Sequence, residues 1–455
     1  MNYYELLRQW NGQQAEKVLL VEDQREYSYG QMLVQVDALR TELAAKATEG
    51  MGGSILVLAD TLNAQLVAFL ALQSLHLRPI LLHHGLPAEE IQAILCENRL
   101  QGLLDVRQRY FDQSNIDQSD FDWSWQESDA QGQKIEPEDI LGVLSSGSTG
   151  VPKVMYRTYE SWAGFFPVQN KIFQITRTTR LFLQGSLSFT GNLNALLGVL
   201  YAGGSIITSS RWHCRWWAQL MADWQVDAIY LVPTKLQLLA AKVKQPLMQV
   251  RSLFTGSQLL SERNIDDLQR LLPEAKIILY YGASELNYIT YTVCGKSKRD
   301  SRNLGRPFPG IGLRVDDGII YVDTPYHVSG LKPPYTVRDT GWLNEAGELM
   351  FEGRRENWIN KGGVKLNTLR LENKLRAVPG IRAAVVMPMA DALRGSTVAA
   401  FVVKEGDVSA AKVRQAVRQV LQPVEIPRRL LFLPRLPLND RGKVDRSVLA
   451  KLVDE

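Results

Sequence analysis

The sequence predicts an α/β protein with a large N-terminal lobe of βαβ units around mostly parallel sheets, followed by a small α+β domain. Short β-branched runs alternate with helical patterns along the N-terminal part of the chain, as in parallel sheets connected by helices. Near the C-terminus the pattern changes to short strands and helices, which is typical of a small α+β domain. The chain has 455 residues, of which 45% are apolar and 22% charged, so it can bury a large core.

The N-terminal alternation can be followed element by element. Its first βαβ unit consists of a strand at 54–59, a helix at 64–77 and a strand at 79–82. The stretch 107–138 is rich in Asp, Gln and Ser, and predicts a surface connection into a buried strand at 140–144. A later series consists of a strand at 204–209, a helix at 216–224, a strand at 226–232 and a helix at 234–244.

The C-terminal pattern predicts a separate domain of about a hundred residues, in the usual size range for a domain. The join falls near Gly353, which gives an N-terminal lobe over 1–352 and a C-terminal domain over 353–455. The predicted elements are strands at 348–352, 381–387, 397–403 and 430–433, and helices at 369–376 and 409–421.

Composition excludes several classes of protein. The 52 basic and 48 acidic side chains are scattered and give a net charge of +4, so nucleic acid is not an expected partner. The three cysteines are far apart, which argues against a disulfide framework and a zinc site and favours a reducing cytoplasm. We expect no secretory signal in the first residues and no membrane span, because apolar runs stay well below the roughly 20 residues that cross a bilayer.

A loop rich in glycine and hydroxyl groups follows the predicted strand at 140–144 and predicts a polyphosphate site. Glycines allow close approach of the backbone, consecutive N–H groups bind anions, and a lysine adds charge. The loop departs from the Walker pattern, because its lysine follows a proline and precedes Val154. The alternative is a solvent-exposed turn. Its residues are Ser145, Ser146, Gly147, Ser148, Thr149, Gly150, Val151, Pro152 and Lys153.

A second loop follows a predicted strand at 276–279, at the carboxyl end where open α/β sheets bind ligands. It offers an aromatic face for a base, a hydroxyl group for a phosphate and a carboxylate for a metal ion. An ordinary aromatic-glycine turn is the alternative. The loop residues are Tyr280, Tyr281, Gly282, Ala283, Ser284 and Glu285.

These two loops, together with three later motifs, resemble the adenylate-forming (AMP-binding) superfamily. That family includes acyl-CoA synthetases, peptide-synthetase adenylation domains and luciferases. The resemblance extends over about 27–449, and the compact length is most similar to short acyl-CoA synthetases such as o-succinylbenzoate-CoA ligase. The later motifs are Asp339 within 337–343, Gly353-Arg354, and Gly442-Lys443 within 438–446.

The resemblance implies roles for these residues with ATP, Mg²⁺ and, as co-substrate, coenzyme A. Asp339 and Arg354 would hold the nucleotide ribose, although an interdomain ion pair is the alternative. Glu285 would bind magnesium, and the neighbouring Ser284 belongs to the same catalytic loop. Lys443 would bridge the substrate carboxylate and the phosphate. Without the resemblance, the sequence around Lys443 predicts only a surface lysine.

The resemblance also implies a mobile C-terminal domain that rotates between two half-reactions. Glu356 matches the hinge and Gly363 the glycine beside the thiol tunnel. Glu356 stands where the family usually has Asp or Lys, and Asn360 stands where a lysine is common. These departures concern thiol transfer rather than adenylation.

Three segments are expected to form the acid pocket, at 181–194, 232–235 and 255–258. The first has no acidic residue, so a free α-amino acid is disfavoured, because its buried ammonium group would lack a counter-charge. Ser188 takes the place of a histidine found in many acyl-CoA ligases. The candidate pocket residues are Ser188, Phe189, Thr190 and Gly256.

The function that follows is an AMP-forming ligase joining a small carboxylic acid to coenzyme A. One alternative is a stand-alone adenylation enzyme that loads the phosphopantetheine of an acyl carrier protein, and another is a non-catalytic nucleotide-binding scaffold. The segment 211–217 is rich in Arg and Trp and predicts the start of an amphipathic helix rather than a nucleic-acid patch. His83 and His84 predict a turn.

Overall fold

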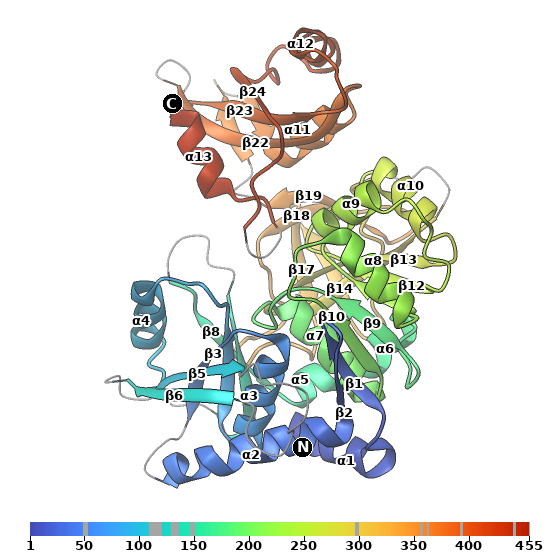
Figure 1. Ribbon diagram of the computed structural model, residues 1–455. Coiled ribbons are helices and arrows are strands. Elements are labelled where there is room, and N and C mark those ends of the chain that lie inside the picture. The colour runs from blue at the N-terminus through green and yellow to red at the C-terminus, as the bar shows by residue number, and fades with distance from the viewer. Residues whose placement is uncertain are drawn as a thin grey trace.

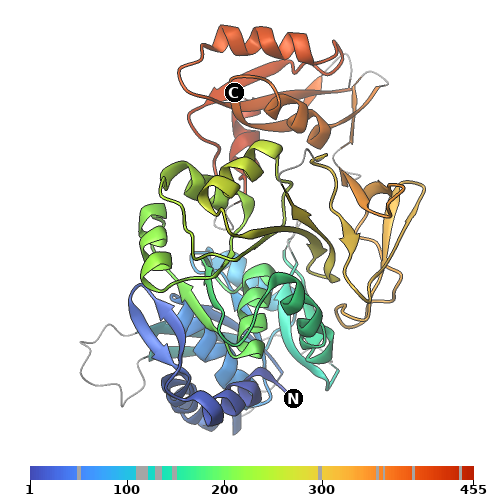
Figure 2. The ribbon, with the colours of Figure 1, turned by 90° about the vertical axis from the view of Figure 1, so that its right-hand side faces the viewer.

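Two large sheets with helices around and between them form the N-terminal lobe, and a smaller domain lies at one end of it (Figures 1 and 2). This computed structural model describes residues 1–48, 53–108, 121–128, 136–145, 151–295, 300–354, 358–361, 364–391, 395–439 and 443–454. The predicted α/β class with a small C-terminal α+β domain is confirmed.

The nine-stranded sheet has the order β15-β14-β13-β12-β11-β9-β10-β1-β2. Its strands from β13 through β1 pair in parallel, whereas β2, β14 and β15 pair antiparallel with their neighbours. The strands are β1 (Val18–Glu22), β2 (Arg25–Ser28), β9 (Arg180–Leu183), β10 (Ser205–Thr208), β11 (Ala228–Tyr230), β12 (Ser252–Thr255), β13 (Lys276–Ala283), β14 (Asn287–Cys294) and β15 (Arg306–Pro307).

The second large sheet has six strands in the order β6-β5-β3-β4-β7-β8. Its central strands are parallel, and both edge strands pair antiparallel. The strands are β3 (Ser54–Ala59), β4 (Arg78–Leu82), β5 (Gly102–Gln108), β6 (Phe121–Glu127), β7 (Asp139–Leu144) and β8 (Val154–Thr158). The prediction of a surface connection over 107–138 was wrong for residues 121–127, which form the edge strand β6. The alternating aromatic side chains of this strand, Phe121, Trp123 and Trp125, pack on the core.

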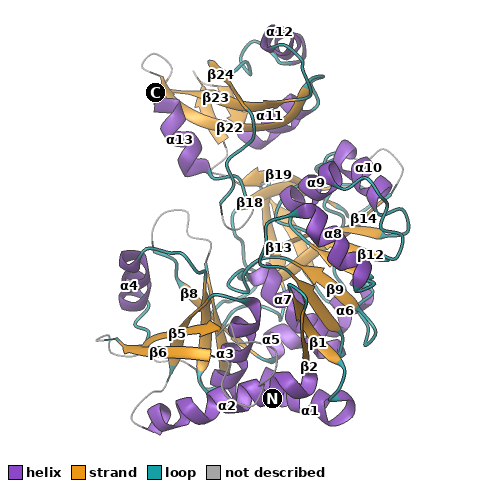
Figure 3. Ribbon diagram, in the orientation of Figure 1, coloured by secondary structure: helices purple, strands orange, loops and turns teal. Residues whose placement is uncertain are grey.

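Helices cover and separate these sheets, as Figure 3 shows by colour. They are α1 (Tyr3–Gln14), α2 (Tyr29–Thr48), α3 (Leu62–Ser74), α4 (Ala88–Glu97), α5 (Glu160–Ala163), α6 (Phe166–Phe173), α7 (Thr190–Ala202), α8 (Cys214–Asp223), α9 (Pro233–Lys242) and α10 (Glu262–Leu271). The predicted helix at 216–224 is confirmed as α8, whose Trp217 is buried. No helix in the described part of the chain has the length and apolar character needed to cross a membrane.

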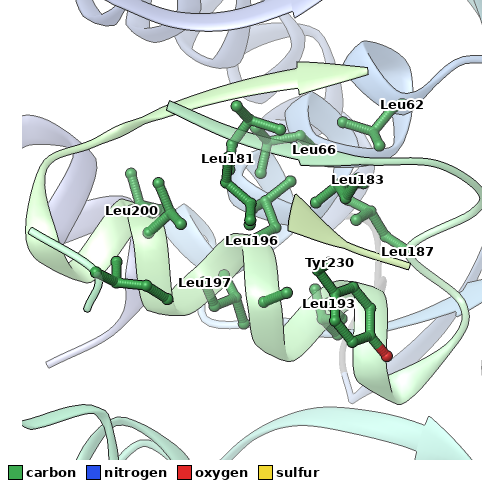
Figure 4. Close-up of a cluster of buried hydrophobic side chains, with 14 of the residues drawn as sticks. Leu62, Leu66, Leu181, Leu183, Leu187, Leu193, Leu196, Leu197, Leu200 and Tyr230 are labelled. Atoms are coloured by element: carbon green, nitrogen blue, oxygen red, sulfur yellow. The ribbon is translucent and has the colours of Figure 1, made fainter. Parts of the chain in front are cut away.

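Helices α3 and α7 are almost entirely buried, because apolar residues occupy every side of them. Figure 4 shows the leucines of α7 packed against those of β9 and α3. The side chain of Thr61 caps α3 by accepting a hydrogen bond from the Ala64 N–H. The buried core therefore fixes the N-terminal end of α7, which begins at the predicted acid-pocket residue Thr190.

A four-stranded antiparallel sheet follows the nine-stranded one. Its strands are β16 (Gly312–Asp316), β17 (Ile319–Asp323), β18 (Asp339–Leu343) and β19 (Leu349–Arg354). Asp339 and Arg354 lie opposite each other on β18 and β19. Strand β19 continues past the predicted join at Gly353, so Asp339 and Arg354 form an ion pair within one sheet rather than between two domains.

The C-terminal domain has a five-stranded sheet with helices packed on it. Its elements are β20 (Trp358–Lys361), β21 (Val364–Asn367), α11 (Thr368–Arg376), β22 (Ile381–Asp391), β23 (Gly395–Lys404), α12 (Ala410–Val420), β24 (Arg429–Leu433) and α13 (Arg446–Asp454). The predicted strand at 348–352 is β19 of the four-stranded sheet and not part of this domain, whereas the other predicted C-terminal helices and strands are present within a few residues of their expected bounds.

Gly191, in the first turn of α7, tests this packing. A Cβ atom there would lie 2.0 Å from the Tyr230 hydroxyl oxygen and 3.1 Å from the ring carbon that bears it. We predict that Gly191→Ala lowers the free energy of unfolding by roughly 1–3 kcal/mol, since overpacking outweighs the better helix propensity of alanine. Chemical denaturation measures this loss.

The matched background is Tyr230→Phe, which removes the clashing oxygen. In the Tyr230→Phe background, Gly191→Ala should lower the free energy of unfolding much less than it does in the wild type, and a double-mutant cycle measures the difference. An equal loss in both backgrounds would contradict the packing described.

Candidate active site

The end of β13 brings an aromatic ring to a buried carboxylate. The strand continues through Ala283, so Tyr281 and Gly282 are strand residues and the loop expected from residue 280 begins only at Ser284. The Tyr281 hydroxyl group donates a 2.6 Å hydrogen bond to Asp339 Oδ2, and its ring centroid lies 5.6 Å from that of Phe351. Gly282 follows at a bulge between β13 and β14, where a Cβ atom would lie 2.6 Å from the Asn287 carbonyl oxygen. The structure therefore joins two predicted nucleotide-binding residues that are far apart in the sequence.

Asp339 is buried with unused capacity to accept hydrogen bonds. Its Oδ1 atom is buried and accepts no hydrogen bond from the described residues, and Arg354 Nε lies 3.4 Å away. Burial raises the pKa of Asp339, although the Tyr281 hydroxyl group and the charge of Arg354 partly offset the effect. Two adjacent hydroxyl groups of a ligand could supply the missing donors.

Ser284 lies beside the first turn of α7. The Ser284 Oγ atom is 3.1 Å from Thr190 Oγ1. The predicted acid-pocket residue Thr190 therefore contacts the predicted catalytic loop. The side chain of Glu285 is partly exposed, and its carbonyl oxygen accepts a hydrogen bond from the Val328 N–H at 2.9 Å. This backbone bond holds the loop without using the Glu285 carboxylate.

Arg157, on β8, is a site-supporting residue that the sequence did not reveal. Its fully buried guanidinium donates to the carbonyl oxygens of Ser284 at 2.7 Å and of Ser161 and Tyr326 at 3.2 Å. Burial lowers its pKa to about 10. A single arginine within a short strand carries no sequence signal, because its partners are backbone carbonyls from distant segments.

The predicted phosphate loop connects β7 and β8. Ser145 Oγ accepts a hydrogen bond from the Lys153 N–H at 2.9 Å, and the Ser145 N–H donates to the Lys153 carbonyl oxygen at 2.8 Å. These bonds close the base of the loop. The predicted residues Ser146, Gly147, Ser148, Thr149 and Gly150 lie outside the described residues.

Lys443 lies on the connection from β24 to α13, which extends toward the N-terminal lobe (Figure 1). Its N–H donates to Asn439 Oδ1 at 3.0 Å, and its carbonyl oxygen accepts from the Asn439 N–H at 2.8 Å. The predicted hinge residue Glu356 and tunnel residue Gly363 lie outside the described residues.

A cavity of about 1080 Å³ lies between the two lobes. Ser186 lines it and donates a 2.9 Å hydrogen bond to Ser188, so the cavity reaches the predicted acid-pocket loop. His83 and His84 also line it, and the ring of His83 lies 5.5 Å from that of Phe189. Residues of the C-terminal domain close the opposite side, among them Arg382, Arg435, Leu436, Asn439 and Val444.

Lys235, in the first turn of α9, is a buried cation on this cavity wall. Its side chain donates to the Gln184 carbonyl oxygen at 2.7 Å and lies 4.9 Å from the centre of the Trp212 ring. Within the described residues it has no ion-pair partner, and burial lowers its pKa to about 8.

This burial predicts a specific dependence of stability on pH. The unfolded lysine has its ordinary pKa of 10.5, so the unfolded chain binds more protons between pH 8 and 10.5, and stability gains from Lys235 as the pH rises through that window. We predict that the unfolding free energy of wild type minus that of Lys235→Met increases by up to about 3 kcal/mol across the window. Urea denaturation at several pH values measures it.

Lys242→Met removes an exposed lysine from the same helix and serves as the control. The same pH dependence for both variants would contradict the assignment to Lys235.

Comparison with known proteins places this geometry in context. Residues 7–324 match the family described as AMP-binding enzyme, and residues 370–443 match the AMP-binding enzyme C-terminal domain. A curated relative, the uncharacterized acyl-CoA ligase YhfT of Bacillus subtilis, is 27% identical over 339 residues, which are 70% of this chain and 70% of that protein.

Solved structures share the fold over nearly the whole chain. ATP-bound MatB from Rhodopseudomonas palustris superimposes with a TM-score of 0.81 at 19% identity, covering 99% of both chains. O-succinylbenzoate coenzyme A synthetase (MenE) from Bacillus subtilis, in complex with ATP and magnesium ion, gives 0.80 at 19% identity, again covering 99% of both chains. With the family match spanning both domains, the chain belongs to the AMP-binding enzyme family of adenylate-forming enzymes.

Proposed function

We propose that this enzyme is an AMP-forming ligase that activates a carboxylic acid with ATP and transfers the acyl group to coenzyme A. A carboxylate oxygen attacks the α-phosphorus of ATP, and the bond to the bridging oxygen breaks to release pyrophosphate. The thiol sulfur of coenzyme A then attacks the carbonyl carbon of the acyl-adenylate. AMP leaves, and the thiol loses its proton.

The observation that carries this proposal is the buried Asp339 Oδ1, which accepts no hydrogen bond from the described residues and lies 3.4 Å from Arg354 Nε. A buried carboxylate oxygen without a donor is costly, and the 2′- and 3′-hydroxyl groups of a ribose would supply donors. The Tyr281 ring offers an aromatic face for the adenine base. A nucleoside therefore fits this cluster better than a lone carboxylate or phosphate does.

Thr190, Ser284 and Glu285 would act on the reacting groups. The two hydroxyl groups, 3.1 Å apart, can donate to phosphoryl oxygens as negative charge develops there. The Glu285 carboxylate suits Mg²⁺, which is usually held by one or two carboxylates together with substrate phosphates. When bound, the ion screens the charge of the triphosphate.

The C-terminal domain would supply Lys443 to the first half-reaction and then rotate. Such a rotation needs weak contacts between the lobes. The ion pair between Arg263 and Glu405 connects the lobes through side chains that are 58% and 40% exposed. Exposed pairs of this kind contribute at most about 1 kcal/mol, so this contact is no barrier to rotation.

We predict that Lys443→Ala lowers acid-dependent pyrophosphate release by roughly 10²–10³-fold, the usual effect of removing a group that stabilises transition-state charge. Thiolysis of a supplied acyl-adenylate should be retained, because that step does not use the lysine. Lys451→Ala, on the exposed side of α13, is the control. Equal loss of both half-reactions would contradict the role of Lys443.

The thiol acceptor is tested by product analysis. With coenzyme A and a phosphopantetheinylated carrier protein offered in turn, we expect the acyl thioester to form on coenzyme A. Thioester on the carrier alone would instead establish the carrier-loading alternative. No pyrophosphate release across a broad panel of acids would favour the non-catalytic scaffold.

A further inference from the structure

Three buried tyrosines form a cluster beside the first turn of α7. Tyr230, Tyr280 and Tyr288, on β11, β13 and β14, are 3%, 6% and 5% exposed. The hydroxyl oxygens of Tyr230 and Tyr280 are 3.0 Å apart, and the ring centroids of Tyr280 and Tyr288 are 4.2 Å apart. Burial raises the pKa of Tyr230 to about 12, so its hydroxyl group stays protonated at neutral pH.

This cluster faces the backbone of two segments predicted to bind the acid. A Cβ atom at Gly191 would lie 2.0 Å from the Tyr230 hydroxyl oxygen, and one at Gly256 would lie 2.4 Å from the Tyr280 ring. Thr190, next to Gly191, approaches Ser284 at 3.1 Å. The first turn of α7 thus lies between the candidate reaction site, which Thr190 contacts, and the tyrosine cluster, which Gly191 contacts. Figure 4 shows Tyr230 near this end of α7.

The spaces beside Gly191 and Gly256 do not admit even a single methyl group. A methylene chain has a similar width, so it cannot pass between these glycines and the rings unless the rings move. Further rings hold the cluster in place: Phe254 lies 5.3 Å from Tyr230, and Phe173 stacks on Phe254 at 4.4 Å and lies 6.0 Å from Tyr280. Close-packed aromatic rings of this kind move only when their neighbours also move.

We propose that Tyr230 and Tyr280 close the inner end of the acid site and restrict the enzyme to short carboxylic acids, with few carbon atoms beyond the carboxyl group. This inference rests on the proposed function and names its substrate class. Tyr230 and Tyr280 are specificity-determining residues here, and the glycines opposite them complete the restriction.

The test uses a series of linear acids, namely propionate, butyrate, hexanoate and octanoate, with pyrophosphate release as the readout. We expect wild-type kcat/KM to be highest for propionate or butyrate and at least tenfold lower for octanoate. Tyr230→Ala should raise the ratio of hexanoate to propionate kcat/KM at least tenfold. Each buried methylene is worth up to about fourfold, from about 0.8 kcal/mol, and hexanoate has three more methylenes than propionate.

Two further variants separate specificity from general loosening of the core. Tyr230→Leu keeps an apolar side chain in place and should give a smaller change in the same direction if Tyr230→Ala folds poorly. Phe69→Ala removes an equally buried aromatic ring from α3 and should leave the acid profile unchanged.

The outcomes distinguish the two levels of the hypothesis. Activity that is equal across the series, or a profile unchanged by both Tyr230 variants, would overturn the inference and leave the proposed function intact. If neither these acids nor any acid of a broader panel causes pyrophosphate release, both the inference about short acids and the proposed function are overturned.

Discussion

The Asp339 carboxylate lies where the nine-stranded sheet meets the small antiparallel sheet, and the Tyr281 hydroxyl group donates to it across that junction. Burying a carboxylate is unfavourable unless its oxygens are hydrogen-bonded, and here one oxygen has its donor while the other does not. A ligand with two adjacent hydroxyl groups would remove that penalty. The position of the candidate nucleotide site therefore depends on this contact between two sheets.

Other buried groups position the rest of the site around this contact. The Arg157 guanidinium binds three backbone carbonyls and joins the edge of the six-stranded sheet to the Ser284 loop. The N-terminal end of α7 then brings Thr190 to Ser284 and Gly191 to Tyr230. One buried helix thus connects the proposed site of phosphoryl transfer, near Thr190, to the tyrosines proposed to limit the acid, near Gly191. The interdomain cavity, with Lys235 on its wall, approaches the same loops from the side of the C-terminal domain.

Periodicity predicted the elements that are regular and local. The first βαβ unit, helices α8 and α9 and the C-terminal strands appear close to their expected residues, because β-branched runs and 3.6-residue patterns are local properties. The strands β14, β16 and β17 were not predicted, since they pair antiparallel and lie outside the alternation of strands and helices that marks βαβ units. The placement of Asp339 beside Arg354 followed from motif resemblance, and the register of β18 and β19 accounts for it. Arg157 and the Tyr230–Tyr280 contact were missed because each depends on segments that meet only in the folded chain.

The most direct measurement is a crystal structure of the enzyme with AMP. We expect the ribose hydroxyl groups to lie within about 3 Å of Asp339 Oδ1, the length of an ordinary hydrogen bond, with adenine against the Tyr281 ring and Arg354 beside the sugar. A nucleotide bound elsewhere, with Asp339 Oδ1 still without a donor, would contradict this expectation.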